Sequence, residues 1–203
     1  MRIDVLTLFP EMFTGVVNSS ILQRAISENH LEINIIDYRE FSLDKNHKVD
    51  DYPYGGGAGM VIEVEPIVLA LRSLPKGYTI LTSPKGATYN QNKAKELSKK
   101  DHLIIICGHY EGIDNRITNY IDEEISIGDY ILTGGEIAAL AMIDSIARLI
   151  PNVLGNQESL QSESFEELLE YPQYTRPEEF EGHKVPSVLL SGHHENVRKW
   201  RRF

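Results

Sequence analysis

The chain has 203 residues and a formal net charge of −10, with 41% hydrophobic and 25% charged residues. This length suits one α/β domain with a small appendage, and the composition is ordinary for a globular protein. The acidic charge argues against a general nucleic-acid binder, although a local basic surface remains compatible with it. No apolar run approaches the ~20 residues of a membrane span, and no signal peptide is recognisable, so we expect a cytoplasmic protein without membrane contact.

Strands and helices alternate through the first 150 residues. Apolar and alternating runs predict strands at Ile3–Phe9, Leu31–Tyr38, Tyr78–Thr82 and His102–Cys107. Helical periodicity predicts helices from Ser19 or Ser20 onward and over Glu65–Leu74, Asn92–Lys100 and Glu136–Ile150. Such alternation is typical of a largely parallel α/β sheet, in which the wholly apolar His102–Cys107 would be a central strand.

The segment Phe41–Met60 has no helical or strand periodicity, and we interpret it as a long loop. Its glycine run, Gly55–Gly59, is not followed by Gly-Lys-Ser/Thr and therefore does not predict a phosphate-binding loop. Two interpretations remain open for this run, namely simple flexibility and adaptable contact with a large ligand.

Three glycine-containing loops follow predicted strands: Ser83–Gly86, Gly108–Gly112 and Ile127–Gly135. Ligands of open α/β sheets collect at the carboxyl ends of the strands, so we expect one pocket lined by all three loops. For Glu111, ligand binding and capping of a turn are equally good interpretations. For Asp129, capping of the adjacent turn is the better interpretation.

Cysteine and histidine patterns exclude several other kinds of site. Cys107 is the only cysteine, which suits a reducing compartment, and burial in a strand is a commoner role for it than nucleophilic catalysis. The seven histidines show no His-x-x-x-His spacing, so the sequence predicts no zinc site.

The predicted helix Glu136–Ile150 is apolar nearly all round, with only Asp144, Ser145 and Arg148 as a polar stripe. It therefore belongs either to the core or to an interface with another subunit. After Gly155 the composition changes, and we assign residues 1–155 to a ligand-binding domain, 156–168 to a linker and 169–203 to a basic helical region.

Five motifs occur in one order along the chain: DDYPYGGGAGM (50–60), CGHYEGIDNR (107–116), EISIGDYILTGGE (124–136), YPQYTRP (171–177) and LLSGHHENVRKWR (189–201). Together they closely resemble the bacterial tRNA (guanine-N1)-methyltransferases, a family of the SPOUT superfamily. The resemblance extends from IDVLTLFPEMF to the end of the chain. Any one motif alone would be weak evidence, whereas five in order are specific.

This resemblance implies a parallel sheet with a deep trefoil knot, an exception to the rule against threaded chains. It implies S-adenosylmethionine as cofactor, with a divalent magnesium ion as a further candidate, and tRNA as substrate. The reaction would be methylation of N1 of the guanosine next to the anticodon, at position 37, after the base is flipped into the pocket. The active form would be a homodimer. We further predict shared active sites, in which one chain supplies the cofactor loops and the other the general base, because the segment Asn156–Glu167 can carry a carboxylate away from its own chain's loops and the apolar helix Glu136–Ile150 suits a dimer interface.

Residue by residue, the resemblance implies the following site. The general base would be Glu170, and the substrate would be contacted by Asp50, Arg176, His194, Lys199 and Arg201. The cofactor would lie against Thr82, Ser83, Pro84, Gly108, Tyr110, Glu111, Gly112, Ile127, Gly128, Tyr130, Leu132, Gly134 and Gly135.

Two departures from the family pattern bear on this assignment. The family often has Asp where this chain has Glu170, and the segment before it often has one more residue. The family's helical C-terminal domain also normally continues beyond Phe203, so we expect that domain to be short and incomplete here.

Two other classes of protein compete with this interpretation. A dinucleotide-binding enzyme would need Gly-x-Gly-x-x-Gly directly after the first strand, where this chain has TLFPEMFTG. A non-enzymatic RNA-binding module would not account for the glycine-rich strand-end loops together with a carboxylate beyond a linker.

Overall fold

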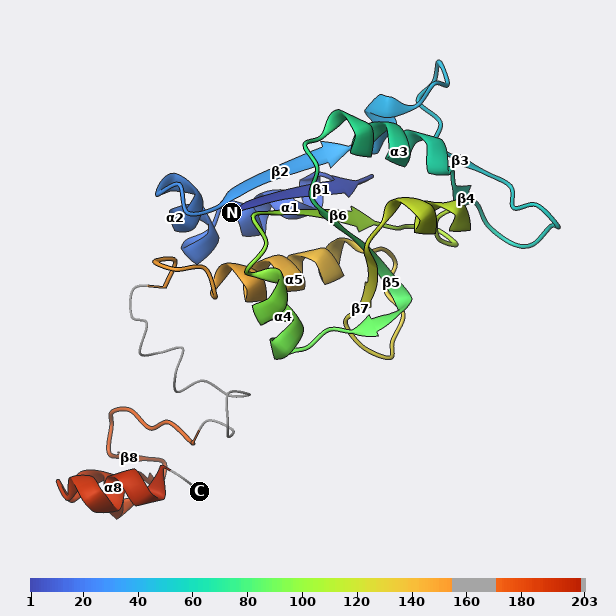
Figure 1. Ribbon diagram of the computed structural model, residues 1–203. Coiled ribbons are helices and arrows are strands. Elements are labelled where there is room, and N and C mark those ends of the chain that lie inside the picture. The colour runs from blue at the N-terminus through green and yellow to red at the C-terminus, as the bar shows by residue number, and fades with distance from the viewer. Residues whose placement is uncertain (155–170, 202–203) are drawn as a thin grey trace. The chain divides into compact units, whose positions relative to one another are not determined.

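The structure is a computed structural model that describes residues 1–154 and 171–201. The chain divides into two compact units, Met1–Gly155 and Asn156–Phe203. Figure 1 shows the first unit as a sheet covered by helices on both faces. No helix among the described residues is long and apolar enough to cross a membrane.

The sheet of the first unit has five strands, and every neighbouring pair is parallel. Its order is β2 (Glu32–Asp37), β1 (Arg2–Thr7), β6 (His102–Cys107), β5 (Tyr78–Thr88) and β7 (Glu123–Ser126). The prediction of a largely parallel α/β sheet is confirmed. The prediction of a central strand at His102–Cys107 is also confirmed, because β6 lies in the middle and is buried from Leu103 to Cys107.

Alternation along the strands divides the core between the two faces of the sheet. On β1, Ile3 and Val5 point into a cluster with Phe13 of α1 and Met142 of α5, whereas Leu6 points into the other cluster. The first face carries α1 (Glu11–Val17), α2 (Ser20–Ser27), α4 (Gln91–Leu97) and α5 (Glu136–Ala147). The second face carries α3 (Val64–Ser73) and the 3-10 helices η1 (Tyr38–Phe41) and η2 (Asn115–Tyr120).

Several boundaries differ from the sequence prediction. The expected loop after Thr82 instead continues β5 to Thr88, with a register shift between Thr82 and Ala87. Gly86 permits this pairing because a Cβ there would collide with the backbone of Glu124. The long loop Phe41–Met60 contains β3 (Asp50–Asp51), which pairs antiparallel with β4 (Val61–Ile62). The helix expected to reach Ile150 ends at Ala147, and α1 was not predicted.

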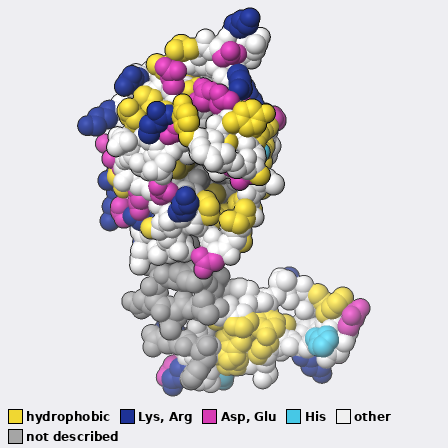
Figure 2. Space-filling model, turned by 90° about the vertical axis from the view of Figure 1, so that its right-hand side faces the viewer, with side chains coloured by type: hydrophobic (Ala, Val, Ile, Leu, Met, Phe, Trp, Pro, Cys, Tyr) yellow, Lys and Arg dark blue, Asp and Glu magenta, His cyan; other side chains and the backbone are white. Residues whose placement is uncertain are grey.

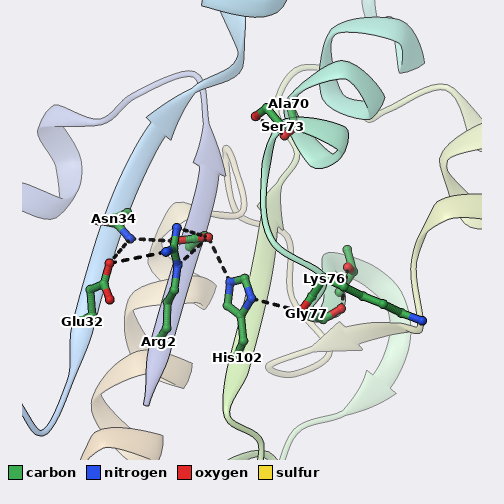
Figure 3. A network of polar contacts seen from close by, with 10 residues as sticks. Arg2, Glu32, Asn34, Ala70, Ser73, Lys76, Gly77 and His102 are labelled. Carbon is green, nitrogen blue, oxygen red and sulfur yellow. Dashed lines mark hydrogen bonds and ion pairs between the residues drawn. The ribbon is translucent and has the colours of Figure 1, made fainter.

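A polar network closes the amino-terminal end of the sheet, as Figure 3 shows. Its centre is Asp4 of β1, which is fully buried. The carboxylate of Asp4 accepts hydrogen bonds from Arg2 Nε at 3.0 Å, Asn34 Nδ2 at 2.8 Å and His102 Nε2 at 2.9 Å. These bonds connect β2, β1 and β6, so the network fastens three neighbouring strands at one end.

The second unit is small and partly described. It contains a hairpin of β8 (Glu179–Phe180) and β9 (His183–Lys184), followed by α7 (Ser187–Leu190) and α8 (His194–Trp200). The Trp200 ring lies 6.2 Å from that of Tyr171 and 6.1 Å from that of Tyr174, so aromatic packing holds α8 to the segment that begins the unit's described part. The predicted linker, residues 156–168, lies outside the described residues.

Candidate functional site

A cavity of about 400 Å³ lies at the carboxyl ends of β6 and β7 and beside the irregular middle of β5, at residues 81–85. All three of the predicted loops contribute to its wall. Every residue predicted to touch the cofactor lines this cavity: Thr82, Ser83, Pro84, Gly108, Tyr110, Glu111, Gly112, Ile127, Gly128, Tyr130, Leu132, Gly134 and Gly135. The structure thus brings together residues that are up to 53 positions apart in the chain, from Thr82 to Gly135. Their role in cofactor binding stays a prediction.

The second and third loops are joined by backbone hydrogen bonding. The Gly135 N–H donates to the Gly108 carbonyl at 2.8 Å, and His109 pairs with Gly134 in an isolated antiparallel bridge. A Cβ on Gly135 would collide with Thr82 Oγ1, so glycine is needed there for packing between the loops. At Gly108 a Cβ would meet only the Ile113 side chain, at an ordinary 3.6 Å. The paired glycines therefore serve loop packing, whereas Gly108 is free of such a constraint.

The second loop is also fastened to the β3–β4 hairpin. The Ile62 N–H donates to the Gly112 carbonyl at 2.9 Å, and the Glu111 N–H donates to the Met60 carbonyl at 3.1 Å. The Glu111 side chain packs over Gly59, where a Cβ would collide with it. The glycine run Gly55–Gly59 therefore ends against the wall of the cavity, which favours the ligand-contact interpretation of that run over simple flexibility.

The turn of the third loop is capped by a residue that the sequence interpretation did not choose. Gly128 N–H donates to Ser126 Oγ at 3.2 Å, and the Ser126 hydroxyl donates back to the Gly128 carbonyl at 3.1 Å. Asp129, the expected cap, is exposed. Ser126 takes this role because it is the last residue of β7 and its side chain points back over the turn.

A buried carboxylate lies beneath the third loop. Glu136, the first residue of α5, is only 1% exposed, and its Oε1 accepts a hydrogen bond from the Thr7 hydroxyl at 2.9 Å. Its Oε2 lies 3.8 Å from His109 Nδ1. This ring nitrogen is buried and has no hydrogen-bond partner in the described part of the chain. His109 lines the cavity, and the sequence interpretation missed it because no spacing pattern connects it with Glu136.

Burial controls the acidity of the side chains behind the cavity. Burial raises the pKa of the Cys107 thiol well above its usual value, and the charge of Glu136 raises it further. Burial and the neighbouring Cys107 and Glu136 also raise the pKa of Tyr38. Because a nucleophilic cysteine needs a lowered pKa, the interpretation of Cys107 as a buried strand residue is supported.

The residues predicted to act on the substrate fall in three places. Asp50 lies on β3 opposite Ile62, one strand away from the second cavity loop. Arg176, His194, Lys199 and Arg201 lie in the second unit, where Lys199 forms an ion pair with Glu195 at 3.0 Å and the Arg201 guanidinium lies over the Tyr171 ring at 4.9 Å. Glu170, the predicted general base, lies outside the described residues.

Comparisons with known proteins identify the family. Residues 1–203 match the family model described as tRNA (Guanine-1)-methyltransferase TrmD. The chain is 59% identical to the tRNA (guanine-N(1)-)-methyltransferase of Clostridium botulinum (strain Hall), over 100% of this chain and 85% of that protein. It is also 59% identical to the enzyme of that name from Carboxydothermus hydrogenoformans, over 100% of this chain and 81% of that one.

The chain belongs to the tRNA (guanine-N1)-methyltransferase family. Among solved structures, the crystal structure of tRNA (m1G37) methyltransferase from Aquifex aeolicus matches with a TM-score of 0.84 and 43% identity. The match covers 98% of this chain and 87% of that one. The resemblance seen in the five motifs is thereby confirmed, as is the expectation that the chain is an enzyme, and the dinucleotide-binding and purely RNA-binding alternatives are set aside.

The surface around the cavity of this family member mixes both signs of charge. On the first unit, the side toward which the arrowheads of β1 and β6 point in Figure 1 carries interspersed basic, acidic and hydrophobic side chains (Figure 2). Within residues 1–154 and 171–201, no group of three or more His, Cys, Asp or Glu side chains is placed to hold a metal ion. The magnesium ion named as a candidate cofactor stays a prediction.

Proposed function

We propose that this protein transfers a methyl group from S-adenosylmethionine to N1 of the guanosine at position 37 of tRNA. One observation carries the proposal: the residues that the family motifs assign to the cofactor line a single cavity at the carboxyl ends of the strands. A structural relative from Aquifex aeolicus is named for this same modified nucleotide. The cavity volume of about 400 Å³ lies in the ~300–1,000 Å³ range of small-molecule sites.

The lining of the cavity suits a cofactor with one polar and one apolar part. Glycines at 108, 112, 134 and 135 bring the backbone to the wall, while Ile127, Leu132 and Ala138 supply apolar surface. The bound cofactor supplies an electrophilic methyl group on a sulfonium. The chain's own contribution at this point is to orient that group and to exclude water from it.

Proton removal from guanine is the second requirement. N1 of guanine carries a proton that must leave before the nitrogen can attack. We assign its removal to Glu170, the carboxylate that directly precedes the YPQYTRP motif. The tRNA would be held by Asp50 on the first unit and by Arg176, His194, Lys199 and Arg201 on the second. Contacts of Arg176, Lys199 and Arg201 with phosphates would make the affinity for tRNA fall steeply as the salt concentration rises.

The threaded topology is part of the same proposal. The His109–Gly134 bridge and the Gly135–Gly108 hydrogen bond join two loops that follow different strands. A deep trefoil knot at this point would hold the cofactor loops together by chain topology as well as by hydrogen bonds.

We also propose a homodimer in which the active site is shared. Apolar side chains remain exposed on α1, on α5 and in the third loop: Met12, Val16, Ile131 and Ile137, the last two being 80% and 52% exposed. The helices α1 and α5 are in contact with each other, so these side chains belong to neighbouring elements. A second copy of the chain would cover them in a symmetric interface. Each cavity would then receive Glu170 from the partner.

The reaction is tested with cofactor labelled on the methyl group and two anticodon stem-loop RNAs. One RNA carries guanosine at position 37, and its matched control carries adenosine there. We expect label only in the first, and Glu170→Gln should lower the single-turnover rate by ~10²–10⁴ because glutamine cannot accept the proton. Equal labelling of both RNAs would overturn the proposed target, and an unchanged rate in Glu170→Gln would overturn the proposed base.

The shared site is tested by mixing two inactive proteins. Glu170→Gln removes the base, and Gly108→Trp fills the cavity from a position where a side chain meets no backbone. After joint unfolding and refolding, a mixed dimer holds one complete site only if base and cofactor loops come from different chains. We expect activity in proportion to the mixed dimer, and purified mixed dimers without activity would show that Glu170 serves its own chain.

A further inference from the structure

His109 and Glu136 form a buried polar pair beside the cavity, and the proposed chemistry does not use it. It lies between the cavity and the core, under the turn at Gly134-Gly135. Glu136 begins α5, and His109 follows β6 in the second cavity loop. The two side chains therefore connect the second loop with the helix that the third loop enters.

The pair is incomplete in the structure. Glu136 Oε1 has the Thr7 hydroxyl as its hydrogen-bond donor, whereas Oε2 lies 3.8 Å from His109 Nδ1, beyond hydrogen-bond distance. Charge-assisted hydrogen bonds of this kind are ~2.7–2.9 Å long, so the two atoms are about 1 Å too far apart. Buried polar atoms without partners are costly and rare, and His109 Nδ1 is such an atom among the described residues.

Gly134 occupies the position that controls this gap. A Cβ added to Gly134 would collide with both Glu136 Oε2 and His109 Nδ1, so the glycine leaves clear the space between the two atoms. His109 and Gly134 are also paired through their backbones, and both line the cavity. A ligand bound against this part of the wall would therefore contact both His109 and the glycine that leaves the gap open.

In the described part of the chain, no acceptor lies within hydrogen-bond distance of His109 Nδ1. The Phe9 ring packs against the imidazole with 4.6 Å between ring centroids, and the Arg39 guanidinium lies on that ring. The Tyr110 ring meets the imidazole edge-on at 5.1 Å. Glu136 is thus the carboxylate that His109 Nδ1 faces in the described structure.

We propose that His109 is a positioning residue for the cofactor: its Nδ1–H donates to Glu136 Oε2 when the cavity is occupied, and this bond fixes the Gly134-Gly135 turn against the ligand. The inference rests on the proposed function, because it takes S-adenosylmethionine as the occupant. His109 acts through the turn and has no part in proton transfer. It should therefore affect cofactor affinity and leave the rate at saturating cofactor nearly unchanged.

Two isosteric variants separate the donor from the bulk of the side chain. In His109→Asn the amide Nδ2 takes the place of Nδ1, whereas His109→Leu has the same shape as asparagine without a donor. Calorimetry with S-adenosylmethionine on the full chain gives the affinity, and thermal unfolding without cofactor reports the fold. We expect His109→Leu to weaken binding about 10- to 100-fold, as for a lost hydrogen bond to a charged group, and His109→Asn to stay within about threefold of the parent.

The partner carboxylate provides a second, independent variant. Glu136→Gln keeps the shape and should weaken binding by itself, and adding His109→Leu to it should cost little more, because the two residues act through one bond. The inference is overturned if both His109 variants bind like the parent, if asparagine and leucine weaken binding equally, or if the losses at the two positions simply add. A parent protein that does not bind S-adenosylmethionine would overturn the proposed function itself, which distinguishes the two failures.

Discussion

The two ends of strand β6 present the same chemistry in two different states. At the amino-terminal end, His102 lies beside the buried carboxylate of Asp4, and just past the carboxyl end, His109 lies beside the buried carboxylate of Glu136. His102 Nε2 donates to Asp4 at 2.9 Å, whereas His109 Nδ1 stands 3.8 Å from Glu136 without a partner. The same kind of histidine–carboxylate pair is therefore hydrogen-bonded at the amino-terminal end of β6 and not hydrogen-bonded at its carboxyl end.

The neighbours of each carboxylate explain the difference. Asp4 also accepts hydrogen bonds from Arg2, on the same strand, and from Asn34, which lies opposite Asp4 on the neighbouring strand β2. The parallel register therefore fixes the positions of both donors. Among the described residues, Glu136 accepts a side-chain hydrogen bond from Thr7 alone, and His109 beside it belongs to a cavity loop. A satisfied network stabilises the fold, whereas the unpartnered His109 Nδ1 belongs to the wall of the cavity, where a ligand is expected.

The largest expected loss of stability is at the amino-terminal end of β6, where the hydrogen bonds of Asp4 are all formed. Asp4→Ala removes the buried acceptor of three side chains and should lower the free energy of unfolding by ~3–5 kcal/mol, because three hydrogen bonds to a charged group, each worth ~1.5–3 kcal/mol, are lost together and are offset in part by the desolvation of Asp4. Urea unfolding measures this loss. The cofactor affinity of the remaining folded protein should be unchanged, since Asp4 lies at the end of the sheet opposite the cavity. A loss below ~1 kcal/mol would mean that the network is not a structural fastening.

A smaller loss of stability is expected for Thr7, which donates to Glu136 near the carboxyl end of β6. Thr7→Val keeps the shape of the side chain but removes the hydroxyl that Glu136 Oε1 depends on and that also accepts the Phe9 N–H at 3.0 Å. The free energy of unfolding should fall by ~1.5–3 kcal/mol, as for hydrogen bonds to charged groups. Unlike Asp4→Ala, this variant should also weaken cofactor binding, because Glu136 loses its anchor. If calorimetry gave the same affinity for S-adenosylmethionine in Thr7→Val and in the parent, the proposed difference between the two ends of β6 would be contradicted.

The two histidines can be compared directly. His102→Leu leaves one oxygen of buried Asp4 without a donor and should lower the free energy of unfolding by ~1–3 kcal/mol. His102→Gln, whose Nε2 can replace the imidazole donor, should recover most of that loss. Cofactor affinity should not change in either variant, in contrast to the variants at His109. A His102 variant that binds the cofactor more weakly would show that the two ends are coupled.

Sequence patterns predicted the fold and the location of the site because those depend on periodicity and order. The apolar run from His102 to Cys107 identified the central strand, and the glycine loops after the strands identified the cavity wall. Family motifs then supplied the individual residues. The β5 extension was missed because Gly86 was interpreted as a loop residue, whereas it allows close contact with the backbone of Glu124.

The contacts that the sequence did not predict are side-chain contacts between distant elements. Thr7 and Glu136 are 129 positions apart, and nothing in either local pattern indicates that they touch. A glutamate at the start of a helix is normally interpreted as a solvated residue near the positive end of the dipole. Here the parallel sheet carries α5 over the end of β1, and burial converts Glu136 into a structural acceptor.

The smallest loss of stability is expected at the edge of the sheet beside β7, away from both ends of β6. Lys93 of α4 lies 3.0 Å from Glu123 Oε1 on β7 and 2.9 Å from Glu96 Oε2, and the hydrogen bonds to Glu96 and Glu123 raise its pKa. Because this cluster is partly solvated, Lys93→Met should lower the free energy of unfolding by only ~0.2–1 kcal/mol. Glu123 would still accept the Tyr78 hydroxyl at 3.1 Å, which limits the loss further.

Salt separates this surface contribution from the buried networks. Ionic strength near 1 M shortens the screening length to ~3 Å, so the difference between Lys93→Met and the parent should shrink in high salt, whereas the loss in Asp4→Ala should persist. Lys99→Met is a matched control, because Lys99 is exposed and its side chain forms no ion pair in the described structure. Urea unfolding of the parent and the two lysine variants at low and high salt makes the comparison. A Lys93→Met loss that exceeds that of His102→Leu would mean that the edge of the sheet and not its amino-terminal end provides the main electrostatic stabilisation. A loss that is unaffected by salt would show that Lys93 does not act through a solvent-screened ion pair.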